Sequence, residues 1–216
     1  MRLPDALRAV LPPETARAWS ELAPLLPSGA YLAGGTGLAA HIHHRVSRDL
    51  DLFCHEAIDL DALQEQLAAT GTFAPTRVGD GVLDGVLAGA KVQFLHARDQ
   101  RRLAPTGRIA GIPVAAVEDI LAMKLKVIGD RGELRDYFDV MSIEQRLGRM
   151  AEEGIALYLE RFQVPAEHES VRHIIRGLGY LEDVDDDDLL PIERGEIERY
   201  WRRRQPQIVR NASRFG

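Results

Sequence analysis

The sequence predicts an α+β protein, in which a core with a mixed sheet and flanking helices is followed by a mostly helical C-terminal region. Three observations support this fold class. Residues 30–53 pass from a strand pattern through a turn and a helix to a second strand, and residues 72–97 hold short apolar runs separated by glycines. After residue 117, apolar residues recur every three to four positions. We place the core at 1–110 and the helical region at 111–216, with a cleft between them.

The first half of the chain carries the signals of both helices and strands. Residues 14–26 contain apolar residues at helical spacing, which predicts a helix that Pro27 and Gly29 end. Asp59 is a suitable cap for a later helix, which Gly71 ends. In chain order we expect helix 14–26, strand 30–34, helix 36–44, strand 49–53, helix 59–70, strands 72–78, 81–88 and 90–97, and one strand at 107–117 that leads into a helix.

The second half is helical almost to its end. The expected helices are 118–129, 133–148, 152–162 and 169–179. The acidic run 181–191 is typical of a solvated loop. The following segment 199–210, RYWRRRQPQIVR, is basic and contains Trp201, so it is either a solvated helix face or a contact for nucleic acid.

Composition excludes several classes of protein. The 216 residues are 45% hydrophobic and 28% charged, which is typical of a globular protein, and the net charge of −6 argues against bulk electrostatic capture of nucleic acid. The single cysteine, Cys54, excludes an intrachain disulfide and fits a reducing compartment. No signal peptide is visible, and no apolar run approaches the roughly 18–20 residues that span a bilayer. We therefore expect a cytoplasmic protein without membrane contact.

Two aspartates inside an apolar strand are the first indication of chemistry. Side chains two positions apart on a strand point the same way, so Asp49 and Asp51 are expected to face together while Leu50 and Leu52 face the core. Two carboxylates this close repel each other unless a cation lies between them. Magnesium is commonly held by one or two carboxylates together with phosphate oxygens and water. The spacing therefore suggests a site that binds a nucleoside triphosphate through Mg²⁺ or Mn²⁺.

The alternative is a solvent-facing strand edge, with each aspartate paired to Arg45 or Arg48. The turn upstream favours the first interpretation. Gly34 and Gly35 follow a strand and precede a helix, and such a turn exposes backbone N–H groups that can seat a phosphate. Thr36 adds a hydroxyl at the same place.

Residues 34–53, GGTGLAAHIHHRVSRDLDLF, resemble the DNA polymerase β-like nucleotidyltransferase superfamily, whose signature is a Gly-Gly or Gly-Ser turn followed by Asp-x-Asp on a strand. Within this superfamily they are similar to the AbiEii/AbiGii toxin-like family, which favours Gly-Gly-Thr and Arg-x-Ser-x-Asp-x-Asp. Arg45, Ser47, Asp49 and Asp51 supply that string here.

A second match lies in the helical half, at residues 118–140. The residues that correspond to the toxin-like family are Lys124, Leu125, Arg131, Arg135, Asp136 and Asp139. Independently of the family, Asp136 and Asp139 share one face of a helix, and Lys124 either crosses to them or reaches a triphosphate. Taken alone, an Arg-Asp pair on a helix is more often a surface salt bridge.

The resemblance implies a polymerase-β-like nucleotidyltransferase core and a Mg²⁺-dependent enzyme. It would move NMP from an NTP to a hydroxyl of tRNA or protein, as the toxin-like component of an abortive-infection or toxin–antitoxin system with an antitoxin partner. Asp49 and Asp51 would bind the metal, Lys124 would neutralise phosphate charge, and Asp136 would orient the acceptor or the lysine. The nucleotide-binding residues would be Gly34, Gly35, Thr36, Arg45, Ser47, Lys91, Arg135 and Asp139, and the cleft would hold the nucleotide.

One departure from the family pattern concerns the central strand, where the family often has Lys-x-Asp. Here Lys91 is followed by Gln93, and an amide neither takes a proton nor balances a metal's charge. Asp84 substitutes for the missing acid if the hairpin register brings it alongside, but its neighbouring glycines also fit a turn. Two further hypotheses therefore stay open: a nucleotidyltransferase acting on a small molecule such as an antibiotic, and a catalytically weak module that binds NTP–Mg²⁺.

Overall fold

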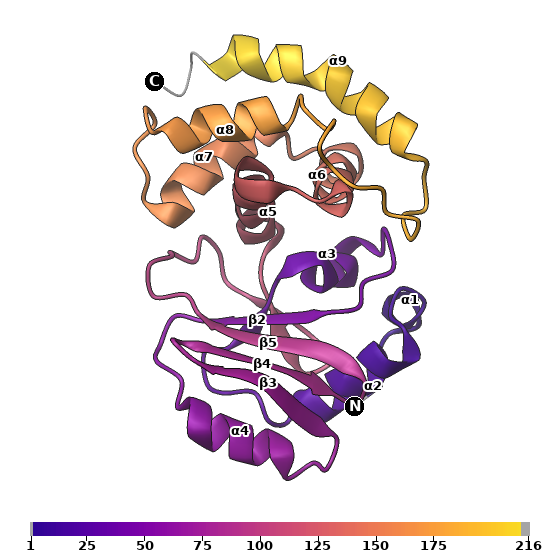
Figure 1. Ribbon diagram of the computed structural model, residues 1–216, viewed down its shortest axis with the longest axis vertical. Helices are drawn as coiled ribbons and strands as arrows, with labels where there is room; N and C mark the ends of the chain where they lie inside the picture. Colours follow the sequence, from indigo (N-terminus) through magenta and orange to yellow (C-terminus); the bar gives the residue numbers. More distant parts are fainter. Residues whose placement is uncertain (1, 213–216) are drawn as a thin grey trace. The chain divides into compact units, whose positions relative to one another are not determined.

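The computed structural model describes residues 2–212, and the chain divides into two compact units. The first unit comprises Met1–Gln100 and Ala104–Ala116, and the second comprises Arg101–Leu103 and Val117–Gly216. Within the described range every strand belongs to the first unit, and the second is built from helices (Figure 1). The α+β class is confirmed. The boundary expected at 110/111 stays a prediction, and the outer ends of both expected domains, residue 1 and residues 213–216, lie outside the described range.

The first unit is organised around a seven-stranded mixed sheet with the strand order β3-β4-β5-β2-β1-β7-β6. β2 pairs in parallel with β5, and β1 pairs in parallel with β7, whereas the other neighbours are antiparallel. The strands are β1 (Tyr31–Leu32), β2 (Leu50–Cys54), β3 (Phe73–Gly79), β4 (Val82–Leu87), β5 (Ala90–His96), β6 (Gly107–Ile109) and β7 (Ile112–Val114). The helices are α1 (Asp5–Arg8), α2 (Pro13–Leu22), α3 (Gly34–Ile42) and α4 (Leu60–Ala68).

One face of this sheet is apolar and carries the core of the unit. Leu50 and Leu52 of β2 are fully buried, as predicted, and belong to one cluster with Trp19 of α2 and Leu63 and Leu67 of α4. The indole Nε1–H of Trp19 also donates to the carbonyl of a residue in the β6–β7 turn, 3.1 Å away. The alternating pattern of β2 therefore places its apolar residues on the face that α2 and α4 cover, and Asp51 on the other.

The structure corrects two boundaries in this unit. The single strand expected at 107–117 is a hairpin, β6 and β7, because Ala110 and Gly111 both have positive φ values, 40° and 84°, which fit a two-residue turn. The two glycines expected to precede the helix lie inside it, since α3 begins at Gly34. Gly34 has φ = 62°, a conformation that glycine adopts without steric cost.

The second unit contains five described helices: α5 (Val117–Arg131), α6 (Leu134–Leu147), α7 (Ala151–Phe162), α8 (Glu169–Gly177) and α9 (Arg194–Ala212). α5 packs closely on α7 at Gly154, where an added Cβ would meet Leu121 and Leu125. Residues 101–103 join this unit through hydrogen bonds, because the N–H of Leu103 donates to Asp119 at 2.9 Å. Asp119 is in turn paired with Arg161, and both side chains are fully buried.

A buried polar network ties α6, α7 and α9 together. The carboxylate of Glu144 accepts hydrogen bonds from Arg204 at 2.9 Å, from the backbone N–H of Ala151 at 2.7 Å, and from the hydroxyl of Tyr200. Burial and this hydrogen bond raise the pKa of Tyr200. Trp201 is also buried and donates to a backbone carbonyl of α6, so the basic segment offers no exposed indole ring. Its other arginines lie on a solvated helix face.

Candidate active site

The glycine turn lies directly against the second aspartate of the pair. The chain leaves β1 with the N–H of Ala33 donating to the carbonyl of Asp51 at 2.9 Å, so the next residue, Gly34, meets the Asp51 side chain. A Cβ at position 34 would overlap that carboxylate. A Cβ at position 35 would crowd the guanidinium of Arg45 and the hydroxyl of Ser47, at 2.5 and 3.1 Å. The turn therefore packs closely against these three side chains, and we call it the glycine cradle.

Thr36 fastens this turn to the segment that carries the aspartates. Its fully buried hydroxyl donates to the carbonyl of Asp49 and lies 2.8 Å from the hydroxyl of Ser47. The buried Arg45 donates to the carbonyl of Val46 at 3.0 Å. The structure thus brings together seven predicted site residues at the N-terminus of α3: Gly34, Gly35, Thr36, Arg45, Ser47, Asp49 and Asp51.

The two aspartates differ in their backbone setting. Asp51 lies within β2, half-buried, on the face opposite Leu50 and Leu52, whereas Asp49 precedes the first residue of the strand. Strand alternation therefore fixes the direction of Asp51 but not of Asp49. The strand-edge part of the alternative is wrong, because β2 lies between β5 and β1 inside the sheet. Pairing of the aspartates with Arg45 or Arg48 stays a prediction.

Three polar side chains form one row across adjacent strands. Asp51 of β2 is the register partner of Gln93 of β5, and Gln93 is the partner of Asp84 of β4. Gln93 donates its side-chain N–H to Asp84 at 2.6 Å. Asp84 therefore lies alongside Gln93 in mid-strand, and the alternative that placed it in a turn is wrong. Lys91, two residues before Gln93, is exposed on the same face of β5.

The bond between Gln93 and Asp84 was not anticipated, although the sequence carries a signal for it. Ala88 and Gly89 form the turn between β4 and β5, and both have positive φ values. In a hairpin with a two-residue turn, residues equally distant from the turn are paired. Asp84 lies four positions before Ala88, and Gln93 lies four positions after Gly89. The pairing of Asp84 with Gln93 therefore follows once the turn is recognised.

The donor atoms present suit a hard divalent cation completed by its substrate. Among residues 2–212, no group of three or more His, Cys, Asp and Glu side chains is arranged to hold a metal ion. Magnesium, however, is usually held by one or two carboxylates together with substrate phosphates and water. Asp49 and Asp51 supply two carboxylates, and the backbone of Gly34 lies directly against one of them. These residues fit the metal that the sequence predicts.

In the helical unit, Lys124 of α5 crosses to the two aspartates of α6. Its ammonium lies 2.7 Å from Asp136 and 2.6 Å from Asp139, and the three side chains are 9%, 7% and 0% exposed. Asp136 also accepts the backbone N–H of Glu133 at 3.0 Å, at the N-terminus of α6. The surface salt bridge considered for these aspartates is thus wrong. Arg135 is partly exposed and pairs with Glu133.

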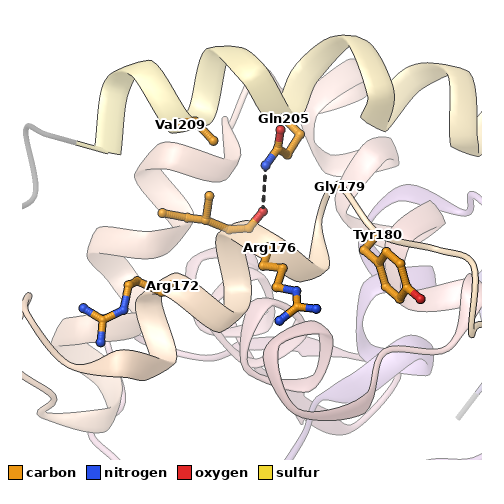
Figure 2. A pocket seen from close by; sticks show the side chains of 7 residues that line it. Arg172, Arg176, Gly179, Tyr180, Gln205 and Val209 are labelled. Carbon is orange, nitrogen blue, oxygen red and sulfur yellow. Dashed lines mark hydrogen bonds between the residues drawn. The ribbon is translucent and has the colours of Figure 1, made fainter.

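A separate cavity of about 420 Å³ lies between α8 and α9 (Figure 2). Gln205 reaches across it to the carbonyl of Ile175 at 3.4 Å. The cavity is lined by Arg172, Ile175, Arg176, Gly179, Tyr180, Gln205 and Val209. No predicted site residue is among them.

The glycine cradle beside an Asp-x-Asp strand, in a mixed sheet, defines a nucleotidyltransferase-like core. The chain matches the family described as "Nucleotidyl transferase AbiEii toxin, Type IV TA system" over residues 17–89 and 93–214, and it belongs to that family. The predicted resemblance is confirmed. The family description supports transferase activity and a role as a toxin of a type IV toxin–antitoxin system.

Three individual proteins are similar to this chain. An uncharacterised protein of Aquifex aeolicus (strain VF5) is 26% identical over 186 residues, which cover 84% of this chain and 88% of the relative. The structure of JHP933 from Helicobacter pylori has a TM-score of 0.58 at 20% identity, covering 99% of this chain and 96% of that one. The nucleotidyltransferase toxin MenT4 of Mycobacterium tuberculosis H37Rv has a TM-score of 0.60 at 19% identity, covering 97% and 90%. At these identities the solved structures establish the shared fold. In the described part of the chain, no helix combines the length and apolarity that a bilayer crossing requires.

Proposed function

We propose that this protein transfers a nucleoside monophosphate from an NTP to a hydroxyl group of tRNA or of a protein. The acceptor oxygen forms a bond to the α-phosphorus, the bond from that phosphorus to the bridging oxygen breaks, and pyrophosphate leaves while the hydroxyl proton is released. The observation that carries the proposal is the contact of the Gly34–Gly35 turn with Asp51, Arg45 and Ser47. This arrangement combines a phosphate seat with a carboxylate in one place.

The residues of the first unit have complementary roles in this proposal. The backbone N–H groups at the start of α3 bind triphosphate oxygens, because the helix N-terminus carries partial positive charge. Arg45, only 8% exposed beside Gly35, adds a full positive charge next to the turn. Thr36 and Ser47 hold the turn in place through their hydroxyl contact. Lys91 is proposed as a further phosphate contact, because its exposed side chain lies on the same face of the sheet as Gln93.

Asp49 and Asp51 are the proposed ligands of a divalent cation, Mg²⁺ or Mn²⁺. When bound, such a cation neutralises phosphate charge and polarises the phosphorus under attack. The hydrogen bonds from Ala33 and Thr36 to the two aspartate carbonyls fix the backbone that carries both ligands. Preorganised ligands of this kind accelerate phosphoryl transfer through positioning and electrostatic stabilisation.

For the helical unit, we propose that Lys124 is the cation that meets a phosphate group of the substrate. Asp136 Oδ1 and Asp139 Oδ2 lie 2.7 and 2.6 Å from its ammonium and so fix its position. Arg135, which is partly exposed next to this pair, is proposed as an additional phosphate contact. The proposal gives Asp136 and Asp139 a positioning role toward the lysine.

Transfer is tested with NTPs labelled in the α-phosphate, supplied with Mg²⁺ and either total tRNA, a protein extract or small hydroxylated antibiotics. We expect the α-label on tRNA or protein and none from γ-labelled NTP, because pyrophosphate carries that phosphate away. Asp51→Asn should abolish the transfer, while Asp61→Asn, the same change on the exposed face of α4, should retain it. Label on small molecules alone would show that the acceptor is a small molecule and not tRNA or protein. Equal labelling by Asp51→Asn and Asp61→Asn would contradict the proposed site.

A second candidate function rests on Gln93, which stands where the family pattern has an acid. It is a module that binds NTP and a divalent cation without transferring NMP. This function predicts Mn²⁺-dependent NTP binding, lost in Asp51→Asn, together with no labelled product from any acceptor. A labelled product from the wild-type protein would exclude it.

We also propose that the enzyme acts as a toxin in the cytoplasm, where NTPs are available and where the single buried Cys54 stays reduced. Its proposed partner is the antitoxin implied by the family description. Expression of the wild-type chain alone should slow growth, and Asp49→Ala should relieve the effect. Toxicity that persists in the variant at equal protein levels would contradict this role.

A further inference from the structure

The row Asp51–Gln93–Asp84 places a neutral amide between two carboxylates. β5 lies between β2 and β4, and the register aligns Gln93 with Asp51 on one side and with Asp84 on the other. The three side chains share one face of the sheet, opposite the apolar core, and each is half-buried. An atom of the Gln93 amide that points toward β2 therefore lies beside Asp51.

The hydrogen bond to Asp84 decides which end of the amide faces which strand. Gln93 Nε2 lies 2.6 Å from Asp84 Oδ1. An ionised carboxylate only accepts hydrogen bonds, so the NH₂ group must point toward it, and the amide cannot rotate to place its oxygen there without losing the bond. Because Nε2 and Oε1 diverge from the same carbon, Oε1 is directed away from β4. Asp84 therefore acts as an orienting group for the oxygen of Gln93.

We propose that Gln93 provides its Oε1 as a third, uncharged oxygen ligand to the divalent cation held by Asp49 and Asp51, and that Asp84 is the positioning residue that directs it. Neighbouring strands lie about 4.8 Å apart, which is within reach of a cation shared by cross-strand side chains. Side-chain amide oxygens are suitable ligands for hard cations. This inference rests on the proposed function, since it assigns a residue to the same metal site.

The row also explains why an acid at position 93 alone would not restore the family arrangement. Gln93→Asp would place a carboxylate directly opposite Asp84, and like charges facing each other across a strand pair repel. The amide avoids this conflict because it donates to one carboxylate and offers an oxygen on its other side. Gln93 and Asp84 thus function as a pair.

Binding of Mn²⁺ alone, followed by loss of the electron paramagnetic resonance signal of the free ion, tests the pair without any catalytic readout. Gln93→Met keeps the length of the side chain but removes the oxygen, and Asp84→Asn removes the orienting charge. We expect each to weaken Mn²⁺ binding by roughly tenfold or more, the range seen when groups that orient a ligand are lost. Asp80→Asn, the same change at an exposed turn position of the β3–β4 hairpin, should leave the affinity unchanged.

The double variant Gln93→Met/Asp84→Asn separates orientation from simple charge. If Asp84 acts through Gln93, the double variant should bind Mn²⁺ about as well as either single variant. If the losses of Mn²⁺ affinity in the two single variants multiply in the double variant, Asp84 does not act through Gln93. If Gln93→Met binds Mn²⁺ with wild-type affinity, Gln93 is not a ligand of the cation. The Asp51→Asn variant tests the proposed function separately. If it binds Mn²⁺ as tightly as the wild-type protein, the cation is not bound at Asp51, and the proposed metal site is wrong.

A measurement on the wild-type protein removes any dependence on how the variants fold. The side-chain NH₂ resonances of Gln93, identified by their absence in Gln93→Met, should shift when Mg²⁺ is added, because coordination polarises the amide. Gln66, exposed on α4, is the internal reference and should not shift. No shift at Gln93, under conditions where Mg²⁺ perturbs the backbone amide of Asp51, would overturn the inference.

Discussion

The carboxylate of Asp51 occupies the space that a side chain at position 34 would need. Gly34 also has φ = 62°, so its small size and its backbone conformation are both required at this point. The contact joins the start of α3 to β2, next to the hydrogen bonds that Ala33 and Thr36 donate to the carbonyls of Asp51 and Asp49. It is the relationship on which the proposed phosphate and metal site depends.

Gly34→Ala should therefore damage both stability and the site. The left-handed backbone costs a residue with a Cβ about 1–2 kcal/mol, and overlap with Asp51 adds roughly 1–3 kcal/mol. Gly148→Ala is the matched control, because Gly148 has φ = 67° and nothing within 4 Å of the added Cβ. Urea unfolding and Mn²⁺ binding measure the two effects. Equal losses of stability in the two variants, with unchanged Mn²⁺ affinity, would show that the contact is unimportant.

Lys124→Met should destabilise the helical unit strongly. It would leave the carboxylates of Asp136 and Asp139 buried without this cation, and removing one partner of a buried ion pair costs roughly 3–5 kcal/mol. Lys126→Met, two positions along the same helix, removes a lysine that is 44% exposed and paired with Asp130, and it should cost about 0.5 kcal/mol or less.

The two tryptophans allow this loss to be assigned to one unit. Trp19 lies in the core of the first unit and Trp201 in the second. In a Trp19→Phe background, fluorescence during urea unfolding reports the helical unit alone. Similar midpoints for Lys124→Met and Lys126→Met would contradict the structural role of the buried lysine.

Alkaline pH should destabilise the protein through Tyr137. Burial, followed by the negative charges of Asp183 and Asp136, raises the pKa of Tyr137 to about 12 from its usual value near 10. The unfolded chain therefore loses this proton first, so the free energy of unfolding is unaffected below pH 10 and falls as the pH rises toward 12. The loss is at most about 3 kcal/mol, because a shift of one pKa unit corresponds to about 1.4 kcal/mol.

Tyr137→Phe provides the comparison for that pH profile. The variant lacks the titrating hydroxyl, so the fall between pH 10 and 12 should be shallower than in the wild-type protein, whatever the stability of the two proteins at pH 8. Urea unfolding at a series of pH values gives the slopes. Parallel profiles would show that Tyr137 titrates normally in the folded protein.

The sequence was sufficient for the parts of the site that depend on local pattern. The alternation of Leu50, Asp51 and Leu52 predicts which side chains are buried, and the glycines and Thr36 predict a tight entry into a helix. These features are set by a few neighbouring residues, so their consequences are readable without the fold. The resemblance of residues 45–51 to the family motif then indicated that these residues and the glycine turn form one site.

Features that depend on long-range pairing were not accessible in the same way. The position of β2 between β5 and β1 is set by contacts distant in sequence, and it decides that Asp51 lies inside the sheet. The strand expected at 107–117 is a hairpin because Ala110 adopts a positive φ, which alanine rarely does. The full burial of Asp119 and Arg161 is likewise invisible until the two charges are seen to pair.

Thermal unfolding with Mg²⁺ and ATP is the most direct test of the proposal that Asp49 and Asp51 hold a divalent cation together with a triphosphate. A ligand that binds only the folded state raises the unfolding temperature. The wild-type protein should show this rise with Mg²⁺ and ATP together, and the Asp49→Asn/Asp51→Asn variant should show none. No rise in the wild-type protein, with any of the four NTPs, or an equal rise in the variant, would contradict the claim.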